Sequence, residues 1–395
     1  MRLNAGKWRR RRGMARLLDA LGADEGLTRY VGGAVRDELL DLPVNDVDLA
    51  TRLRPAEVVE RLEAAKIRAV PTGIDHGTIT AVSNGHAVEV TSLRRDVTTD
   101  GRRATVAFTD DWQEDAARRD FTINALSADP ETGEVFDYFR GIEDLTTRRV
   151  RFIGDPYQRI AEDHLRILRF FRFHARFGEG EPDADALGAC TARANDLMAL
   201  SRERIADELL KLLSVPDPTP TIRIMLDRSI LRPVLPEITG QSADCLRALV
   251  DAERDAGIDA QPLRRLSALV PRDPRIAEQI AVRLKLSTRG RKRLACSTTP
   301  DLEINAQALA YYVGRECATD RLLLAGNSKA AAELLSWEPI RLPVGGGDLI
   351  KRGLQPGPIV AKTLRMVERR WVEAGFPDDA ELDQIVAQAL AAVTE

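Results

Sequence analysis

TRYVGGAVRDELLDLPVNDVDLAT, residues 28–51, predicts a strand, a glycine turn, a helix and a second strand in succession. The first strand ends at Val31, and Gly32 and Gly33 follow it directly. Glycines at such a turn let backbone N–H groups approach an anion, and the N-terminus of a helix favours negative charge. Arg36 lies in the first turn of the helix, where it can reach a phosphate. A simple turn without a ligand is the alternative, and the residues that follow favour the phosphate.

Two carboxylates stand on the second strand, within NDVDL (residues 45–49). Residues i and i+2 of a strand point to the same face, so Asp46 and Asp48 project side by side. Such a pair is repulsive in a structural role, but it suits a divalent cation, and Mg²⁺ prefers oxygen ligands. Glu89, on a predicted strand of its own, would complete the set if the two strands are neighbours. The alternatives are a solvated acidic turn and a surface glutamate.

Short β-type runs alternate with helical patterns before residue 150, and almost wholly helical periodicity follows. The fold class is therefore an α/β head, with helices around a mixed sheet, followed by an all-α neck, body and tail. The β-type runs lie at residues 28–31, 47–50, 77–82 and 87–92. The predicted divisions are a basic N-terminal segment (1–24), the head (25–150), the neck (151–215), the body (216–330) and the tail (331–395). The basic segment is expected to be a mobile solvated tail, with an RNA-binding arm as the alternative.

Length and composition set the broad class. A chain of 395 residues suits two or three domains, and 44% apolar with 30% charged residues is an ordinary globular balance. The formal net charge of −3 argues against a uniformly basic chromatin-like protein and against an acidic disordered one, while nucleic acid stays open as a partner. No apolar run is long enough for a membrane span. Four cysteines without paired spacing predict neither a disulfide framework nor a cysteine zinc site, and they suit a reducing cytoplasm.

An ordered series of motifs resembles the nucleotidyltransferase superfamily, and within it the bacterial and eukaryotic class of tRNA CCA-adding enzymes with their sister poly(A) polymerases. VGGAVRD with DVDLAT is similar to the catalytic motif of the family, and GIDHGTITAV and VEVTSLR are similar to its next two strands. EDAARRDFTINALSAD resembles the ribose-binding motif, RIAEDHLRILRFFRFHARFG the base-selecting helix and LSRERIADELLKLL the helix after it. The series spans about residues 28–215, and GGGDLIKRGLQPGP adds a weaker likeness near the C-terminus.

The resemblance implies template-independent addition of CCA to the 3′ end of tRNA from CTP and ATP, with release of pyrophosphate. Asp46 and Asp48, with Glu89 as the third catalytic carboxylate, would hold two Mg²⁺ ions. The partners are tRNA and the two nucleotides, and no DNA is expected. The first alternative is a poly(A) polymerase, or a partial enzyme that adds only CC or only A. A catalytically silent RNA-binding protein and a small-molecule nucleotidyltransferase are less favoured, because the catalytic set is present and the helical body is long.

Further residues are predicted to bind the nucleotide. The resemblance assigns the ribose to Arg119 and Asp120, with a helix N-cap as the alternative for Asp120. Cytosine and adenine offer an amino donor beside a ring-nitrogen acceptor, whereas uracil and guanine offer the reverse order. Since Asp163 only accepts and Arg166 only donates, this pair on one helix face would select C and A. A salt bridge from Glu162 to Arg166 is the alternative, and Arg169 is expected to reach the triphosphate.

Two basic or polar stretches remain. RLKLSTRGRKR (residues 283–293) predicts a patch that binds the RNA backbone, made by Arg289, Arg291, Lys292 and Arg293. The alternative is a solvated charged turn. RRDVTTDGRRATVAF (residues 94–108) predicts either a mobile loop, as the resemblance implies, or a long hairpin turn. The helical tail (331–395) is expected to contact tRNA as well.

Overall fold

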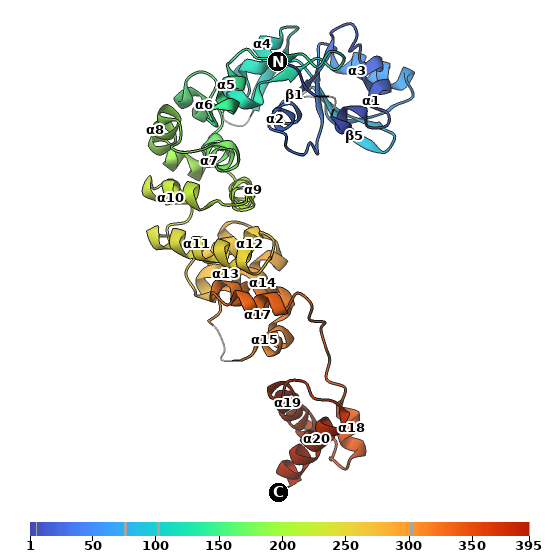
Figure 1. Ribbon diagram of the computed structural model, residues 1–395, viewed down its shortest axis with the longest axis vertical. Coiled ribbons are helices and arrows are strands. Elements are labelled where there is room, and N and C mark those ends of the chain that lie inside the picture. The colour runs from blue at the N-terminus through green and yellow to red at the C-terminus, as the bar shows by residue number, and fades with distance from the viewer. Residues whose placement is uncertain (5, 75–76, 101–102, 301–303, 395) are drawn as a thin grey trace. The chain divides into compact units, whose positions relative to one another are not determined.

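The structure, a computed structural model, forms two units, Met1–Pro236 and Glu237–Glu395, and Figure 1 labels many of their elements. It describes residues 1–4, 6–74, 77–100, 103–300 and 304–394. The first unit contains every strand of the described chain, and the second unit is helical. This agrees with the predicted α/β head followed by helices.

Seven strands within the described part of the first unit form one mixed sheet, in the order β3-β4-β5-β2-β1-β8-β9. Neighbouring strands are antiparallel except β2 and β5, which run parallel. The strands are β1 (Thr28–Val31), β2 (Asp48–Thr51), β3 (Arg68–Gly73), β4 (Thr78–Ser83), β5 (His86–Ser92), β8 (Ser127–Ala128) and β9 (Val135–Phe136). The four predicted β-type runs are confirmed to within one residue at each end. Alternation of burial along β4 produces the two faces that the period of two predicts.

A hairpin occupies the segment for which either a loop or a long hairpin turn was predicted. Strands β6 (Arg94–Asp100) and β7 (Arg103–Phe108) pair antiparallel as a separate two-stranded sheet. Residues 101 and 102 of the predicted segment lie outside the described residues.

Some helices of the first unit pack around the sheet, and the others come after it along the chain (Figure 1). The helix α7 carries four phenylalanines of RFFRFHARF inward, and Phe170 and Phe171 are fully buried, so these aromatics form part of the core. The helical elements are η1 (Lys7–Arg10), α1 (Met14–Ala20), α2 (Gly33–Leu39), α3 (Pro55–Ala64), α4 (Trp112–Ala117), η3 (Thr122–Asn124), α5 (Gly141–Thr146), α6 (Pro156–Glu162), α7 (Arg166–Phe177), α8 (Ala184–Ala192), η4 (Ala194–Ala199), α9 (Arg202–Leu213) and α10 (Thr219–Asp227).

The basic N-terminal segment differs from the predicted mobile tail, because it is packed on the sheet. Trp8 is buried, and its ring meets the ring of Tyr30 edge to face with 4.7 Å between centroids. The backbone N–H of Leu3 donates to the carbonyl of Gly133 at 2.8 Å. Trp8 is therefore the apolar side chain within the basic run that packs the segment onto the sheet.

The second unit is built from α11 (Gly240–Asp255), α12 (Pro262–Leu269), α13 (Pro274–Arg283), α14 (Thr288–Ser297), α15 (Ala306–Val313), α16 (Arg315–Leu324), α17 (Ser328–Glu333), α18 (Gly346–Lys351), α19 (Pro358–Glu373) and α20 (Asp379–Thr394). Leu349, Val367, Trp371 and Val386 form one apolar cluster among the last three helices. The glycine-rich stretch before α19 thus includes a packed helix, α18, rather than connector alone. No helix in the described ranges has the length and apolar character needed to cross a bilayer.

Cys296 and Cys317 form a disulfide bond between α14 and α16, which the cysteine spacing did not predict. They lie 21 residues apart on helices that pack together, so only the tertiary fold brings the sulfurs within bonding distance. The other two cysteines are free, Cys190 in a buried position and Cys245 in an exposed one.

A buried ionic network holds the same helices. Asp320 is fully buried, and its carboxylate accepts hydrogen bonds from Arg264 at 2.7 Å and from Arg293 at 2.7 and 2.9 Å. Both arginines are almost completely buried as well. Arg264 also pairs with Glu253 and Arg293 with Glu316, so Asp320 is the carboxylate that the two arginines share.

Asp320→Ala is therefore expected to lower the free energy of unfolding by about 3–5 kcal/mol, because it breaks a buried ionic network by removing the carboxylate that two buried arginines share. Urea denaturation followed by circular dichroism measures it. Asp251→Ala, which breaks an exposed pair with Arg254, is the control and should change stability by less than about 1 kcal/mol. Equal effects of the two substitutions would contradict the structural role of the network.

Candidate active site

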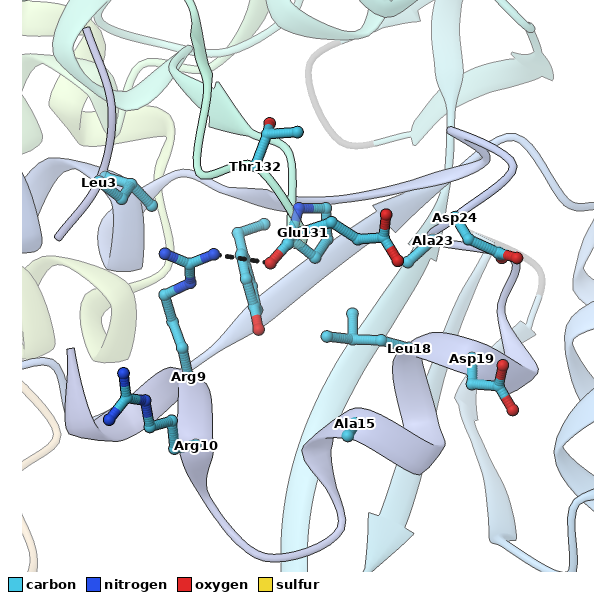
Figure 2. A pocket seen from close by; sticks show the side chains of 12 residues that line it. Leu3, Arg9, Arg10, Ala15, Leu18, Asp19, Ala23, Asp24, Glu131 and Thr132 are labelled. Carbon is cyan, nitrogen blue, oxygen red and sulfur yellow. Dashed lines mark hydrogen bonds between the residues drawn. The ribbon is translucent and has the colours of Figure 1, made fainter. Parts of the chain in front are cut away.

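A cleft of about 460 Å³ in the first unit gathers the predicted nucleotide-binding residues. Its lining comprises Gly32, Gly33, Arg36, Asp48, Arg119, Asp120, Asn124, Asp163, Arg166, Arg169 and Phe173. All eight residues predicted to bind the nucleotide are in this set, although they come from segments between residues 32 and 169. A larger cleft of about 640 Å³ lies beside the N-terminal segment (Figure 2) and includes none of the predicted site residues.

The carboxylates lie where β2 and β5 run side by side. Asp48 is directly opposite Glu89 in the parallel register, so the predicted neighbourhood of these strands is confirmed. Asp46 is exposed in the extended segment just before β2, and the buried Val47 separates it from Asp48. Burial raises the pKa of Asp48, and the charges of Glu89 and Asp46 raise it further against the opposing charge of Arg119. Glu89 and Asp46 thus act electrostatically on Asp48, which is the one of the three carboxylates in the lining of the cleft.

The glycine turn has the conformation that its sequence predicts. Gly32 has a φ of +65°, and a Cβ at this position would lie 3.0 Å from Nη1 of Arg119. Its N–H donates to the carbonyl of Leu126 at 3.0 Å. Gly33 is the first residue of α2, where N–H groups have no acceptor inside the helix. The turn therefore presents the positive end of α2 to the cleft.

Arg36 reaches the cleft from α2 but is held by neighbours. Its Nε donates to Asp37 at 2.8 Å, and its Nη1 donates to Oδ1 of Asn124 at 2.5 Å. The guanidinium also lies 4.1 Å from the ring centroid of Phe177. Burial lowers the pKa of Arg36, while Asp37 opposes that shift. Its position is fixed before any anion binds.

Asp120 is surrounded by donors. Oδ1 accepts from the N–H of Phe121 and from Asn124, both at 2.9 Å, and Oδ2 accepts from Nε and Nη2 of Arg169 at 2.8 and 2.5 Å. Burial would raise the pKa of Asp120, but Arg169 and these hydrogen bonds outweigh it, so the pKa is lowered. Phe121, rather than Asp120, is the residue that caps the short helix η3. The carboxylate is therefore ionised and its lone pairs are occupied.

Arg119 lies between two acidic groups. Its Nη2 is 3.4 Å from Oδ2 of Asp115, and its Nη1 donates to the carbonyl of Asn124 at 3.4 Å. Burial lowers the pKa of Arg119, against the charges of Asp115 and Asp48. These long contacts leave the guanidinium weakly held compared with Arg169.

Asp163 and Arg166 are not on one helix, which corrects the geometric premise of the predicted pair. Helix α6 ends at Glu162, Asp163 has an extended φ of −151°, and α7 begins at Arg166. The two side chains nevertheless line the same cleft. Arg166 donates to Oε2 of Glu162 at 2.5 Å, so the alternative salt bridge is present. The role of the pair in base selection stays a prediction.

Several partners of these residues were not predicted. Arg204 on α9 donates to Oδ2 of Asp163 at 2.8 Å. Glu208, one turn further on, is buried and accepts from Nε of Arg172 at 2.6 Å. Their spacing of four residues puts both on one face of α9, which packs against α7. In the sequence, the spacing of Arg204 and Glu208 indicates only that they share a helix face. It does not indicate that they pair with Asp163 and Arg172.

The predicted RNA-binding residues lie on α14 in the second unit. Arg289 and Lys292 are exposed, and both line a cleft of about 630 Å³ that Arg293 and Arg315 also line. Arg291 is half-buried, and Arg293 is buried against Asp320 and Glu316. Arg293 thus has a structural environment that differs from that of the other three.

Comparisons with known proteins identify the family. The model of the poly(A) polymerase head domain matches residues 28–151, and the model of the probable RNA and SrmB-binding site of polymerase A matches residues 181–241. The mitochondrial CCA tRNA nucleotidyltransferase 1 of Homo sapiens is 34% identical over 91% of this chain and 85% of its own length. The CCA-adding enzyme of Streptococcus gordonii is 32% identical over 89% of this chain and 90% of its own length. The crystal structure of the Bacillus stearothermophilus CCA-adding enzyme in complex with CTP superposes with a TM-score of 0.73 at 25% identity, covering 97% of this chain and 99% of that one. Similarity of this extent, on a cleft lined by the residues that the family motifs predict, shows that the chain belongs to the CCA-adding tRNA nucleotidyltransferases.

Proposed function

We propose that this protein adds CCA to the 3′ end of tRNA from CTP and ATP without a nucleic-acid template and releases pyrophosphate. The observation that carries the proposal is the single cleft that all eight predicted nucleotide-binding residues line together with Asp48. The relatives named as CCA-adding enzymes, which match most of this chain, support it.

The donor set fits a divalent cation. Asp48 and Glu89 are in register on adjacent strands, Asp46 precedes Asp48 by two residues, and all three offer only carboxylate oxygens. Within the residues that the structure describes, no three His, Cys, Asp or Glu side chains cluster closely enough to bind a metal by themselves. Mg²⁺ typically takes one or two carboxylates and completes its shell with substrate phosphates and water, so the proposal needs only Asp46 and Asp48 as protein ligands. Asp46 and Asp48 would hold the metal, whose chemistry is to activate the RNA 3′-hydroxyl and to stabilise the departing pyrophosphate.

The other cleft residues bind and orient the nucleotide. Gly32, Gly33 and Arg36 present N–H groups and a fixed positive charge to the phosphates, and Arg169 adds a second charge. Arg119 and Asp120 bind the ribose. Because four donors already occupy the carboxylate of Asp120, a ribose hydroxyl has to replace one of them.

Base selection is proposed for Asp163 and Arg166. In the structure Arg204 donates to Asp163, and Arg166 donates to Glu162. Each residue has to bind the base with the atoms that its protein partner leaves available. A carboxylate oxygen of Asp163 accepts from the amino group, and an N–H of Arg166 donates to the ring nitrogen. Uracil and guanine would then leave polar groups unpaired, which gives strong discrimination.

tRNA is proposed to contact Arg289, Arg291 and Lys292, together with the tail (331–395). Arg293 does not join this proposal, because its guanidinium is buried on Asp320 and Glu316. No DNA substrate is expected. A cytoplasmic location stays a prediction, since the relatives include mitochondrial forms.

A poly(A) polymerase is the second candidate, since the matched head model carries that name. One assay separates the candidates. Purified protein is given a tRNA that lacks CCA, with single labelled nucleotides and Mg²⁺, and the added residues are counted. We expect C, C and then A to be added, with UTP and GTP excluded. Long A tails would favour the polymerase, addition of CC or A alone would indicate a partial enzyme, and no incorporation would favour a silent RNA-binding protein.

A further inference from the structure

The N-terminal strap, defined as residues 6–12, is anchored to the head at several points. Nε1 of Trp8 donates to Oε2 of Glu38 on α2 at 2.6 Å. Arg9 donates to the carbonyl of Pro130 at 2.6 Å, the contact drawn as a dashed line in Figure 2. Trp8 also packs on Tyr30, whose strand leads directly into the glycine turn. The strap therefore touches both elements that flank Gly32 and Gly33.

Arg11 makes the contact closest in sequence to the catalytic carboxylates. Its Nη2 donates to the carbonyl of Val44 at 2.8 Å, and its Nη1 donates to the carbonyl of Asn45 at 3.0 Å. Two arms of one planar guanidinium thus hold two successive peptide units. The next residue along the chain is Asp46.

The segment that Arg11 holds has little other support. Residues 43–46 lie outside helix and strand, between the end of α2 and the start of β2. Among the residues that the structure describes, the two bonds from Arg11 are the hydrogen bonds that this segment makes. Asp46 is exposed, so packing does not fix it either. Its direction relative to Asp48 consequently depends on the backbone before it.

We infer that Arg11 is a positioning residue for divalent-cation binding, because it fixes the backbone that carries Asp46. The inference rests on the proposed metal role of Asp46 and Asp48. Arg11 is not among the residues that line the cleft. It acts through the peptide units of Val44 and Asn45, so that the two aspartates converge without first ordering a loose segment.

The consequence is a change in metal dependence. Groups that orient metal ligands typically influence metal affinity or activity 10- to 100-fold. Arg11→Ala should therefore raise the Mg²⁺ concentration for half-maximal CCA incorporation by about 10-fold. The KM for CTP measured at saturating Mg²⁺ and the affinity for tRNA in EDTA should stay within about twofold of wild type. A general loss of folding would change all of these quantities together.

The experiment compares four variants with wild type by Mg²⁺ titration of CCA incorporation, with thermal melting measured on each. Arg12→Ala is the matched control, since Arg12 is exposed and makes no hydrogen bond or ion pair with the described residues. Arg11→Lys can satisfy only one of the two carbonyls well, so it should be intermediate between wild type and Arg11→Ala. If Arg11→Ala does not fold, the Mg²⁺ concentration for half-maximal incorporation by Arg11→Lys tests the positioning role instead. Asp46→Ala is the fourth variant.

The outcomes distinguish the positioning role of Arg11 from the proposed metal-binding role of Asp46 and Asp48. A Mg²⁺ titration of folded Arg11→Ala that matches Arg12→Ala would overturn the positioning role. An active Asp46→Ala would instead overturn the proposed metal role, whatever Arg11 does. Loss of activity in Asp46→Ala with a shifted titration in Arg11→Ala supports both.

Discussion

Asp48→Asn is expected to reduce CCA incorporation by about 10²- to 10³-fold, the scale on which one electrostatic group acts on a charged transition state. Asp48 is the carboxylate that lines the cleft and lies in register with Glu89. The amide keeps the shape of the side chain and removes its charge. Single-turnover incorporation of labelled CTP into tRNA lacking CCA measures the change.

The same substitution is expected to stabilise the metal-free fold. Burial and the nearby Glu89 raise the pKa of Asp48, so the folded state disfavours its charge. A carboxylate whose folded pKa is raised costs stability above that pKa, and the cost vanishes below the ordinary aspartate value near 4. Asp48→Asn should thus melt above wild type in EDTA at pH 7, and the difference should shrink as the pH falls toward 4.

Asp41→Asn is the control for both measurements. Asp41 is exposed, lies on the segment between α2 and β2, and has a φ of 55° that asparagine tolerates. It should leave incorporation and melting temperature unchanged. Substantial activity in Asp48→Asn would refute the metal assignment. A melting temperature below wild type would mean that the carboxylate is a structural group.

Prediction from the sequence was most successful where the chemistry is local. The glycine turn and the Arg119–Asp120 pair are each contained in one short segment, and both line the cleft as predicted. What these residues and the Asp46–Asp48 pair bind stays a prediction. The register of Asp48 with Glu89 required only that two predicted strands be neighbours. Asp120 and Asp163 line one cleft, as their two family motifs together predict.

Partnerships between distant segments were not predictable in the same way. Asp120 pairs with Arg169 across 49 residues, and Asp163 with Arg204 across 41. Each arginine in the sequence has many carboxylates that it could meet, and only packing selects one. The break between α6 and α7 was missed for a related reason, because Asp163 and His164 interrupt a sequence whose helical periodicity continues on both sides. The disulfide and the strap likewise depend on tertiary contacts.

Asp163→Asn is expected to lower the preference for CTP over UTP by roughly 10- to 100-fold, which is about 1.5–3 kcal/mol for a hydrogen bond to a charged group. The reason is donor and acceptor chemistry. An aspartate only accepts, so it binds the amino group of cytosine and repels the carbonyl of uracil. Asparagine can turn its amide and donate to that carbonyl. Arg166 still opposes the ring N–H of uracil, so the preference should weaken rather than invert.

Two further variants show whether the effect belongs to base recognition. Arg204→Ala removes the group that holds Asp163 but leaves an acceptor in place, so rates should change while the CTP to UTP ratio is kept. Asp196→Asn removes a nearby carboxylate that does not line the cleft, and it should change neither. The measured quantity is the ratio of kcat/KM for the two nucleotides at the first added position. An unchanged CTP to UTP ratio in Asp163→Asn would exclude this side chain from base selection. An altered ratio in Arg204→Ala would show that the position of Asp163, and not only its charge, contributes to base selection.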